Sequence, residues 1–162
     1  MFRLIILLAL ISLICASAQA RTRVYRSPDG VGTAIVTAQP VSDEGVVTLY
    51  RRGRPRACRS FVSDGNHGQI VERAAWTPDS RFFVFTTSSS GGHSPWHHWT
   101  FAWSRRDNKI HSLDDAYSST MTEAFQLKAP DFLTTCFQNE DGRALTVRLS
   151  RVHWKPGIGA SR

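Results

Sequence analysis

The sequence predicts an all-β domain, an antiparallel meander of about three similar repeats. A Pro-Asp turn recurs about every 50 residues, with its prolines at Pro28, Pro78 and Pro130. Each turn is followed by a short run of β-branched and aromatic residues, then by a polar gap and a second extended run. Helical periodicity is scarce, and only residues 114–123 (DDAYSSTMTE) are expected to contain a short helical turn.

The first repeat, near residues 24–63, begins with the turn SPDG at residues 27–30. Proline fixes its own φ there, and the aspartate carboxylate can accept hydrogen bonds from nearby backbone N–H groups, so the turn starts the strand that follows it. The runs GTAIVTA (32–38) and VVTLYRR (46–52) are predicted as strands. A hairpin at SDEG (42–45) joins them, because Gly and Asp accept turn dihedral angles.

The second repeat, near residues 74–115, carries the turn TPDS and the run RFFVFTT at residues 81–87. Both alternating faces of that run are apolar, which predicts an inner strand covered on both sides. The next run, residues 98–105, should be a strand with one bulky face and one small face. The bulky face holds His97, Trp99, Phe101 and Trp103, and the small face holds His98, Thr100, Ala102 and Ser104. Trp76, beside the turn, is expected to pack between repeats.

The third repeat, near residues 121–151, has the turn APDF at residues 129–132. It continues with FLTTCFQ (132–138), the turn NEDG (139–142) and ALTVRLSR (144–151). These segments predict a further hairpin of two strands.

The order of these segments resembles a blade of the TolB-type, WD-repeat-like β-propellers of bacterial envelope proteins. The resemblance is carried by TPDS, RFFVFTTS, a polar loop, HWTFAWS, the turn RRDNK and the closing run KIHSLDD. It implies four-stranded blades arranged radially, and binding or scaffolding more often than catalysis. Propellers typically have four to eight blades, so three repeats do not close a ring. Either two chains form a six-bladed ring as a homodimer, or the repeats form a partial propeller, that is, an open or sandwich-like β domain.

The two ends of the chain predict export. Residues 1–20 (MFRLIILLALISLICASAQA) have the charged, apolar and small-residue order of a secretory signal peptide, with cleavage expected after Ala20 or Ala18. Residues 21–154 are expected to form the single all-β domain, and residues 155–162 a flexible tail. No second apolar segment is long enough for a membrane helix, so we expect a periplasmic or secreted protein without a transmembrane segment after cleavage.

The charge of the chain indicates its partners. It carries 20 Lys and Arg against 13 Asp and Glu, a net charge of +7, and most of its cations are arginine. Removal of Arg3 with the leader takes the cations from 20 to 19 and the net charge to +6. An exported protein of this charge is expected to meet an envelope protein or an anionic surface, and its compartment argues against nucleic acid.

Three cysteines remain to be placed. Cys15 lies in the leader, where Ile14 stands in place of the small residue that usually precedes a lipidated cysteine. Cys58 and Cys136 are a candidate disulfide in an oxidising compartment, and the bond would stabilise the fold by roughly 4 kcal/mol on the chain-entropy argument. Two free buried thiols are the alternative, because a sequence does not show whether two Cβ atoms meet.

The stretch GGHSPWHHW at residues 91–99, here called the His-rich loop, is a candidate ligand site. Trp96 lies in a loop that contains Gly and Pro residues, where an exposed indole could bind a sugar or a proline-rich peptide beside His93 and His97. The imidazoles of His93, His97 and His98 are also candidate zinc or copper ligands. However, adjacent strand residues point to opposite faces, so imidazoles that satisfy loop hydrogen bonds beside core aromatics are the alternative.

A second candidate site is the arginine hairpin, RRGRPRACR at residues 51–59. Arg52, Arg54 and Arg56 could bind phosphate or carboxylate groups through paired hydrogen bonds. The alternative is a solvated hairpin end that keeps a sheet edge from aggregating.

The sequence contains no G-x-S-x-G elbow, no phosphate-binding glycine loop and no HExxH pair. It therefore favours an exported, non-catalytic binding or scaffolding module of the cell envelope that needs no cofactor. A secreted metal-binding protein or hydrolase that uses the His-rich loop is the alternative.

Overall fold

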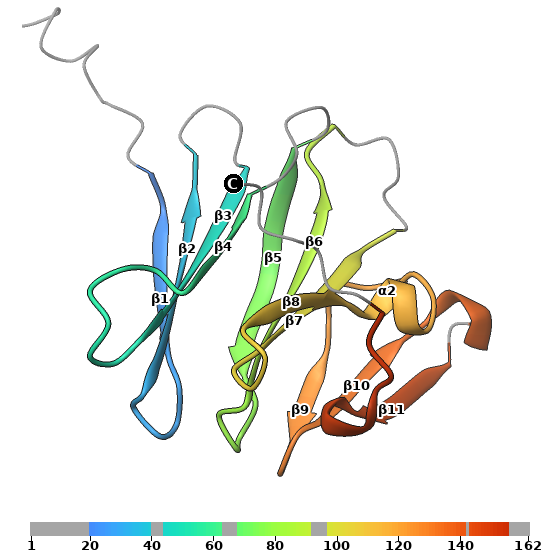
Figure 1. Ribbon diagram of the computed structural model, residues 1–162. Coiled ribbons are helices and arrows are strands. Elements are labelled where there is room, and N and C mark those ends of the chain that lie inside the picture. The colour runs from blue at the N-terminus through green and yellow to red at the C-terminus, as the bar shows by residue number, and fades with distance from the viewer. Residues whose placement is uncertain (1–19, 40–43, 63–67, 92–96, 142, 156–162) are drawn as a thin grey trace, which may run out of the picture.

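The computed structural model describes residues 20–39, 44–62, 68–91, 97–141 and 143–155, which form three antiparallel sheets (Figure 1). The first sheet contains β1 (Thr22–Arg26), β2 (Gly32–Ala38), β3 (Gly45–Arg51) and β4 (Arg59–Val62). The second contains β5 (Gln69–Trp76), β6 (Phe82–Ser89), β7 (Trp99–Ser104) and β8 (Lys109–Ser112). The third contains β9 (Gln126–Lys128), β10 (Phe132–Cys136) and β11 (Ala144–Arg148).

Each sheet is a meander in which strands that follow one another in the chain also pair. The described helices are short: α2 (Leu113–Ala116), which lies between the second and third sheets in the chain, and the 3-10 helices η1 (Gln138–Glu140) and η2 (Leu149–Arg151). The predicted all-β class is confirmed, with sheets that stay open. In the part of the chain that the structure describes, none of the helices has the length and apolarity needed to span a bilayer.

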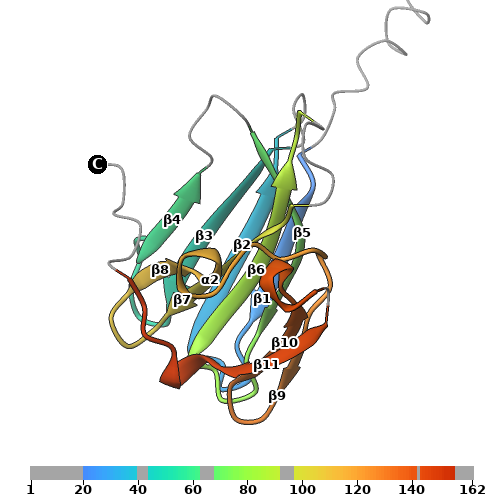
Figure 2. The same ribbon diagram turned by 90° about the vertical axis from the view of Figure 1, so that its right-hand side faces the viewer.

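Two separate hydrophobic cores hold the three sheets together. The first core lies between the first and second sheets and buries Ala34, Val36, Val47, Leu49, Phe61, Trp76, Phe83, Phe85, Phe101, Trp103 and Ile110. The second core lies between the second and third sheets and buries Phe82, Val84, Ala102, Leu113, Phe125, Leu133, Phe137, Val147 and Leu149. Figure 2, seen from the side of the third sheet, shows this sheet and α2 lying in front of the second sheet.

The middle sheet is covered on both faces, as the sequence predicts. On β6, Phe83 and Phe85 point into the first core, while Phe82 and Val84 point into the second. The predicted bulky face of β7 likewise enters the first core, and its small face enters the second through Ala102. Because an apolar side chain gains about 1.5–3 kcal/mol on full burial, a strand that is apolar on both faces is stable only in such an inner position.

Trp76, at the end of β5, packs between the first two repeats as expected. It is 8% exposed, and its ring centroid lies 5.2 Å from that of Phe83 and 5.8 Å from that of Trp103. Gly32 of the first sheet lies directly against the indole, since a Cβ atom there would come within 2.5 Å of it. The glycine therefore leaves room for the closest approach between the two sheets.

The third repeat departs from the expectation in two ways. Its described sheet has three strands, whereas the propeller resemblance implies four. The run predicted as one strand over 144–151 leaves the sheet after Arg148 and continues as η2. The reason is local, because the Ser150 N–H donates to the Asp131 side chain at 2.7 Å and the Val152 N–H donates back to the Leu149 carbonyl at 3.3 Å. The helical turn expected within 114–123 is present, but it begins earlier, as α2 at Leu113.

Candidate functional site

The Pro-Asp turns lie at one end of the sheets, which we call the Pro-Asp end. It is formed by the β1–β2, β3–β4, β5–β6, β7–β8 and β9–β10 connections, which share an end because connections alternate in a meander. In the first turn Ser27 Oγ donates to Asp29 Oδ1 at 2.6 Å and accepts from the first N–H of β2 at 2.7 Å. In the second, Thr77 Oγ1 makes the same contacts with Asp79 Oδ1 (2.7 Å) and the first N–H of β6 (3.1 Å). The hydroxyl before each proline thus fixes the turn to its strand.

The third turn is built differently because Ala129 stands where the other turns have a hydroxyl. Its carboxylate, Asp131, is completely buried. Asp131 Oδ2 accepts from the Ser150 N–H at 2.7 Å, and Oδ1 accepts from Arg148 Nε at 3.2 Å. This aspartate therefore ties the turn to the C-terminal segment instead of to its own strand.

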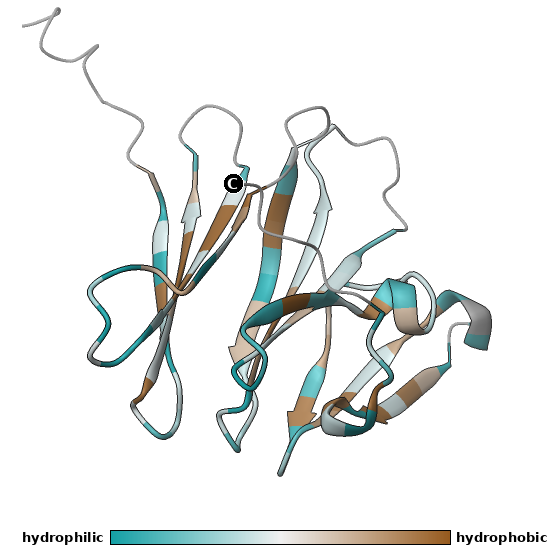
Figure 3. Ribbon diagram, in the orientation of Figure 1, coloured by the Kyte–Doolittle hydropathy of each residue, from teal (hydrophilic) through white to brown (hydrophobic). Residues whose placement is uncertain are grey.

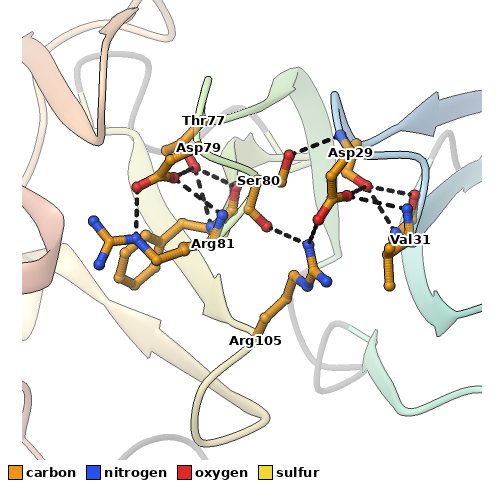
Figure 4. A network of polar contacts seen from close by, with 10 residues as sticks. Asp29, Val31, Thr77, Asp79, Ser80, Arg81 and Arg105 are labelled. Carbon is orange, nitrogen blue, oxygen red and sulfur yellow. Dashed lines mark hydrogen bonds and ion pairs between the residues drawn. The ribbon is translucent and has the colours of Figure 1, made fainter.

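Direct contacts join the first turn to the second (Figure 4). The Asp29 N–H donates to Ser80 Oγ at 3.1 Å. Arg105, from the β7–β8 turn, donates through Nη1 to Asp29 Oδ2 at 2.6 Å and to the Ser80 carbonyl at 2.8 Å. One guanidinium thus bridges a carboxylate of the first sheet and a carbonyl of the second.

A second arginine joins the second turn to the third. Arg81 Nε lies 2.5 Å from Asp79 Oδ2, and its Nη2 lies 3.4 Å from Asp131 Oδ1. The Asp79 N–H also donates to the Pro130 carbonyl at 3.1 Å. The three turns consequently form one continuous polar network across the end of all three sheets.

The network lowers the pKa of two of its carboxylates, Asp29 and Asp131. The hydrogen bond from Ser27, with further help from Arg105, lowers the pKa of Asp29 from 3.8 to about 2. At Asp131 burial acts to raise the pKa, but hydrogen bonds from Ser150 and Arg148 and the charge of Arg81 outweigh it, and the pKa lies below its usual value.

The arginine hairpin lies at the same end, between β3 and β4, and is largely hydrophilic (Figure 3). Arg59 anchors it, because its Nε and Nη2 donate to the Asn108 carbonyl at 3.0 and 2.9 Å. Asn108 returns a hydrogen bond from Nδ2 to the Cys58 carbonyl at 3.1 Å. The candidate ligand residues of this hairpin, Arg52, Arg54 and Arg56, are all exposed. The hairpin is therefore held at its base and presents its arginines to solvent.

Charge is segregated between the two ends of the sheets. The described acids at the Pro-Asp end are Asp29, Asp79, Asp107 and Asp131, and each pairs with an arginine or histidine. Among the described residues, these arginines of the same end have no carboxylate partner: Arg52, Arg54, Arg56, Arg106 and Arg151. The connections of the opposite end carry Glu44, Asp114, Asp115, Glu123, Glu140 and Asp141. The result is a basic end and an acidic end.

The described part of the His-rich loop lies at the opposite, acidic end, so it does not form one surface with the arginine hairpin. His97 Nε2 lies 3.1 Å from Asp114 Oδ2, and its ring packs against that of Trp99 in a tilted arrangement with centroids 4.2 Å apart. The Thr100 N–H donates to Asp114 Oδ1 at 3.2 Å. Burial raises the pKa of Asp114, although these hydrogen bonds act against it. His97 itself thus lies beside α2, which carries Asp114.

The predicted metal site is not assembled within the described residues. His97 and His98 face different carboxylates, with His98 Nε2 3.9 Å from Glu123 Oε2. No group of three or more His, Cys, Asp or Glu side chains that could hold a metal occurs in the ranges that the structure describes. Among the described residues, the hydrogen-bond partner of the His97 ring is the Asp114 carboxylate, and no hydroxyl or thiol is bonded to it. His93 and Trp96, two predicted ligand residues, lie outside the described residues.

The structure holds Cys58 and Cys136 as free, half-buried cysteines rather than as the candidate disulfide. Cys58 comes just before β4 of the first sheet, and Cys136 ends β10 of the third. The second sheet packs between those two sheets, which is why the pair does not bond. The alternative of two free thiols describes the structure.

Several residues of the Pro-Asp end were not singled out by their sequence. Arg81, Arg105 and Asn108 look like ordinary hairpin residues in RFFVF and SRRDNK, and no spacing connects them to the turns. Their one sign in the sequence is that an arginine directly follows the second Pro-Asp turn and another begins the β7–β8 connection.

Comparison of this chain with protein families, with curated proteins and with solved structures found no match.

Proposed function

We propose that the protein is an exported, non-catalytic binding module that holds an anionic partner of the cell envelope against its Pro-Asp end. The observation that carries the proposal is the pairing pattern at that end. Its described acids are already paired within the protein, whereas Arg52, Arg54, Arg56, Arg106 and Arg151 have no carboxylate partner among the described residues. Guanidinium groups in this state bind carboxylate, phosphate or sulfate groups through charge-assisted hydrogen bonds.

The segregation of charge between the two ends of the sheets supports the Pro-Asp end as the binding face. A basic end and an acidic end orient the molecule as it approaches an anionic partner, because the acidic end is repelled while the arginines are attracted. The net charge, +7 for the full chain and +6 without the predicted leader, adds to this attraction at long range. An envelope protein with an acidic surface, an anionic glycan and a membrane with anionic headgroups all meet the requirement.

Preorganisation supports binding rather than chemistry. The turn network and the Arg59–Asn108 contact fix the base of the arginine hairpin before a partner arrives, which lowers the entropic cost of binding. The predicted leader and the TolB-type resemblance, which implies binding or scaffolding in the envelope, point in the same direction.

The test compares two triple variants that remove the same charge. Arg52→Ser/Arg54→Ser/Arg56→Ser removes three exposed arginines from the Pro-Asp end. The matched control, Arg21→Ser/Arg23→Ser/Arg143→Ser, removes three exposed arginines from the opposite half. Affinity is measured for an immobilised uronic-acid polysaccharide and for vesicles with anionic phospholipid, with a neutral polysaccharide and neutral vesicles as references.

We expect the hairpin variant to bind at least about tenfold more weakly than the parent, with the remaining binding lost at high salt, and the control variant to bind nearly as the parent does. Circular dichroism confirms that both variants fold. Equal losses in the two variants would show that net charge alone drives binding and would contradict the proposed face. Absence of binding to both anionic surfaces, and to polyglutamate as a probe for an acidic protein, would contradict the function.

A further inference from the structure

A cavity of about 270 Å³ lies at the Pro-Asp end, between the second sheet and the C-terminal segment. Arg81 from the β5–β6 turn and Arg106 and Asp107 from the β7–β8 turn form one side. Ser150 of η2 and Trp154 beyond it form the other. The cavity therefore combines two cations, a carboxylate, a polar residue and an indole within one opening.

The indole wall is fixed by the residues behind it. Trp154 is half-buried and stacks on the ring of His111, with centroids 4.8 Å apart and planes 22° from parallel. His111 is itself buried, and its Nε2 lies 2.8 Å from Asp107 Oδ2. The same side is also held at Ser150, whose N–H donates to the buried Asp131 at 2.7 Å. A rigid, partly exposed indole is the flat apolar surface on which a sugar ring stacks.

The two arginines differ in a useful way. Arg81 is held by Asp79 and Asp131, yet its side chain is 50% exposed, so it offers free N–H groups from a fixed position. Arg106 is exposed and pairs with no carboxylate in the described part of the chain. Together they supply one fixed and one movable guanidinium, which suits a carboxylate or phosphate group better than a neutral one.

The remaining polar groups suit the hydroxyls of a sugar ring rather than a bare inorganic anion. Asp107 is a hydrogen-bond acceptor, and although burial acts to raise its pKa, hydrogen bonds from Ser104 and His111 hold that pKa below its usual value. A charged carboxylate on the wall would repel a small inorganic anion. It accepts hydrogen bonds from hydroxyl groups, as do the nearby serine hydroxyls.

We propose that this cavity binds one anionic sugar residue, with the ring on Trp154, the hydroxyls on Asp107 and the serines, and the acidic group on Arg81 and Arg106. The volume supports a single residue, since sites for drug-sized ligands begin at about 300 Å³. This inference rests on the proposed function, because it names the chemistry of the anionic partner that the Pro-Asp end receives.

The test uses monosaccharides as probes: glucuronate for the carboxylated source, glucose 6-phosphate for the phosphorylated source, and glucose as the neutral reference. Binding is measured by calorimetry and by tryptophan fluorescence. We expect at least one charged sugar to bind and glucose to bind at least about tenfold more weakly. The preferred charged sugar identifies the source of the acidic group.

Three variants test the residues. Arg106→Gln should weaken binding about tenfold, because it removes one charge-assisted contact. Arg143→Gln, which changes an exposed arginine of the opposite end, should bind as the parent does. Trp154→Phe keeps an aromatic wall, so calorimetry should still detect binding while the fluorescence response is lost.

The outcomes separate this site from the wider function. If no charged sugar binds while binding of the polysaccharide still depends on the arginine hairpin, the proposed sugar site is contradicted and the proposed function stands. Equal binding of glucose, an unaffected Arg106→Gln variant or a fluorescence response that survives in Trp154→Phe would each overturn the site. Sugar binding that depends on Arg106, without any binding to the polymer or vesicles, would support the cavity and contradict the function.

Discussion

Trp76 Nε1 donates a 3.0 Å hydrogen bond to the backbone carbonyl of Tyr25, 51 residues earlier in the chain. The donor ends β5 of the second sheet and the acceptor lies in β1 of the first. The same indole packs on Phe83 and Trp103 in the first core. One side chain thus satisfies a polar group at the sheet edge and closes the apolar space behind it.

Changing Trp76 should separate these two roles. Trp76→Phe keeps most of the packing but leaves the Tyr25 carbonyl without its donor, and should reduce the free energy of unfolding by about 1–3 kcal/mol. Trp76→Ala also opens a cavity and should cost about 3–5 kcal/mol. Urea denaturation measures both. Equal losses would mean that the packing of the ring contributes nothing beyond the hydrogen bond.

Gly32 offers an independent check of the same contact. Gly32→Ala places a Cβ within 2.5 Å of the Trp76 indole, so the sheets must shift apart, and we expect a loss of about 1–3 kcal/mol in the free energy of unfolding. Gly30→Ala is not a suitable control, because Gly30 has a positive φ of 68°. Ala74→Gly, which removes a methyl group from β5 without a clash, should cost about 1 kcal/mol. A stable Gly32→Ala protein would contradict the close approach.

Burial of both faces of β6 predicts a contrast between two valines. Val84 is fully buried in the second core, whereas Val24 of β1 is 57% exposed. Val84→Ala should lower the free energy of unfolding by about 2 kcal/mol, and Val24→Ala by less than about 0.5 kcal/mol. Thermal denaturation of the two variants, which lose the same two methyl groups, makes the comparison direct. A smaller effect at Val84 than at Val24 would contradict the assignment of the middle sheet.

Asp29 should contribute to acid sensitivity. Its folded-state pKa of about 2 lies below the ordinary value of 3.8, so the stabilisation from its ionised form is present above about pH 4 and is lost as the pH falls towards 2. Asp29→Asn should therefore flatten the fall of the unfolding free energy over that interval. The contribution is modest, because the Asp29 side chain is 41% exposed.

Asp114 provides the control of opposite sign. Burial raises its folded-state pKa, so its ionisation costs stability, and that cost appears as the pH rises above the ordinary value. The difference in unfolding free energy between the parent and Asp114→Asn should fall with rising pH, whereas for Asp29→Asn it should rise. Urea titrations at a series of pH values measure both differences. If both differences changed in the same direction with rising pH, the opposite pKa shifts of Asp29 and Asp114 would be refuted.

The two half-buried thiols make a chemical prediction. Alkylation of the unfolded protein without reductant should label both Cys58 and Cys136, and peptide mapping should find neither in a disulfide. In the folded protein both should react slowly, because each is partly covered. Labelling that appears only after reduction would show that the protein forms a disulfide between the sheets.

The strand pattern was the most predictable part of the molecule. The run RFFVFTT is apolar on both faces, and only an inner strand accommodates that pattern. The position of β6 and the burial of both its faces could therefore be predicted from this run. The run GTAIVTA corresponds to β2. Weak segments escaped notice, since β1 is mostly exposed and β9 has three residues, so neither carries an apolar signal of its own.

The candidate site was predictable only in part. The exposure of Arg52, Arg54 and Arg56 follows from a hairpin rich in Gly and Pro. Their separation from His97 follows from the alternation of connections, which needs the strand order to be known. The partnership of His97 with Asp114 and the position of Trp154 over His111 depend on tertiary packing between distant segments, and spacing along the chain does not encode either.

The two cores have no residue in common, and this has a consequence for how the protein opens. Each terminal sheet contacts the middle one through a separate set of side chains, so the molecule behaves as a row with nearest-neighbour coupling. Detachment of β9–β11 would expose the second core and leave the first intact. Amide hydrogens of β10 should therefore exchange by local opening, while those of β6 and β7 exchange only when the whole protein unfolds.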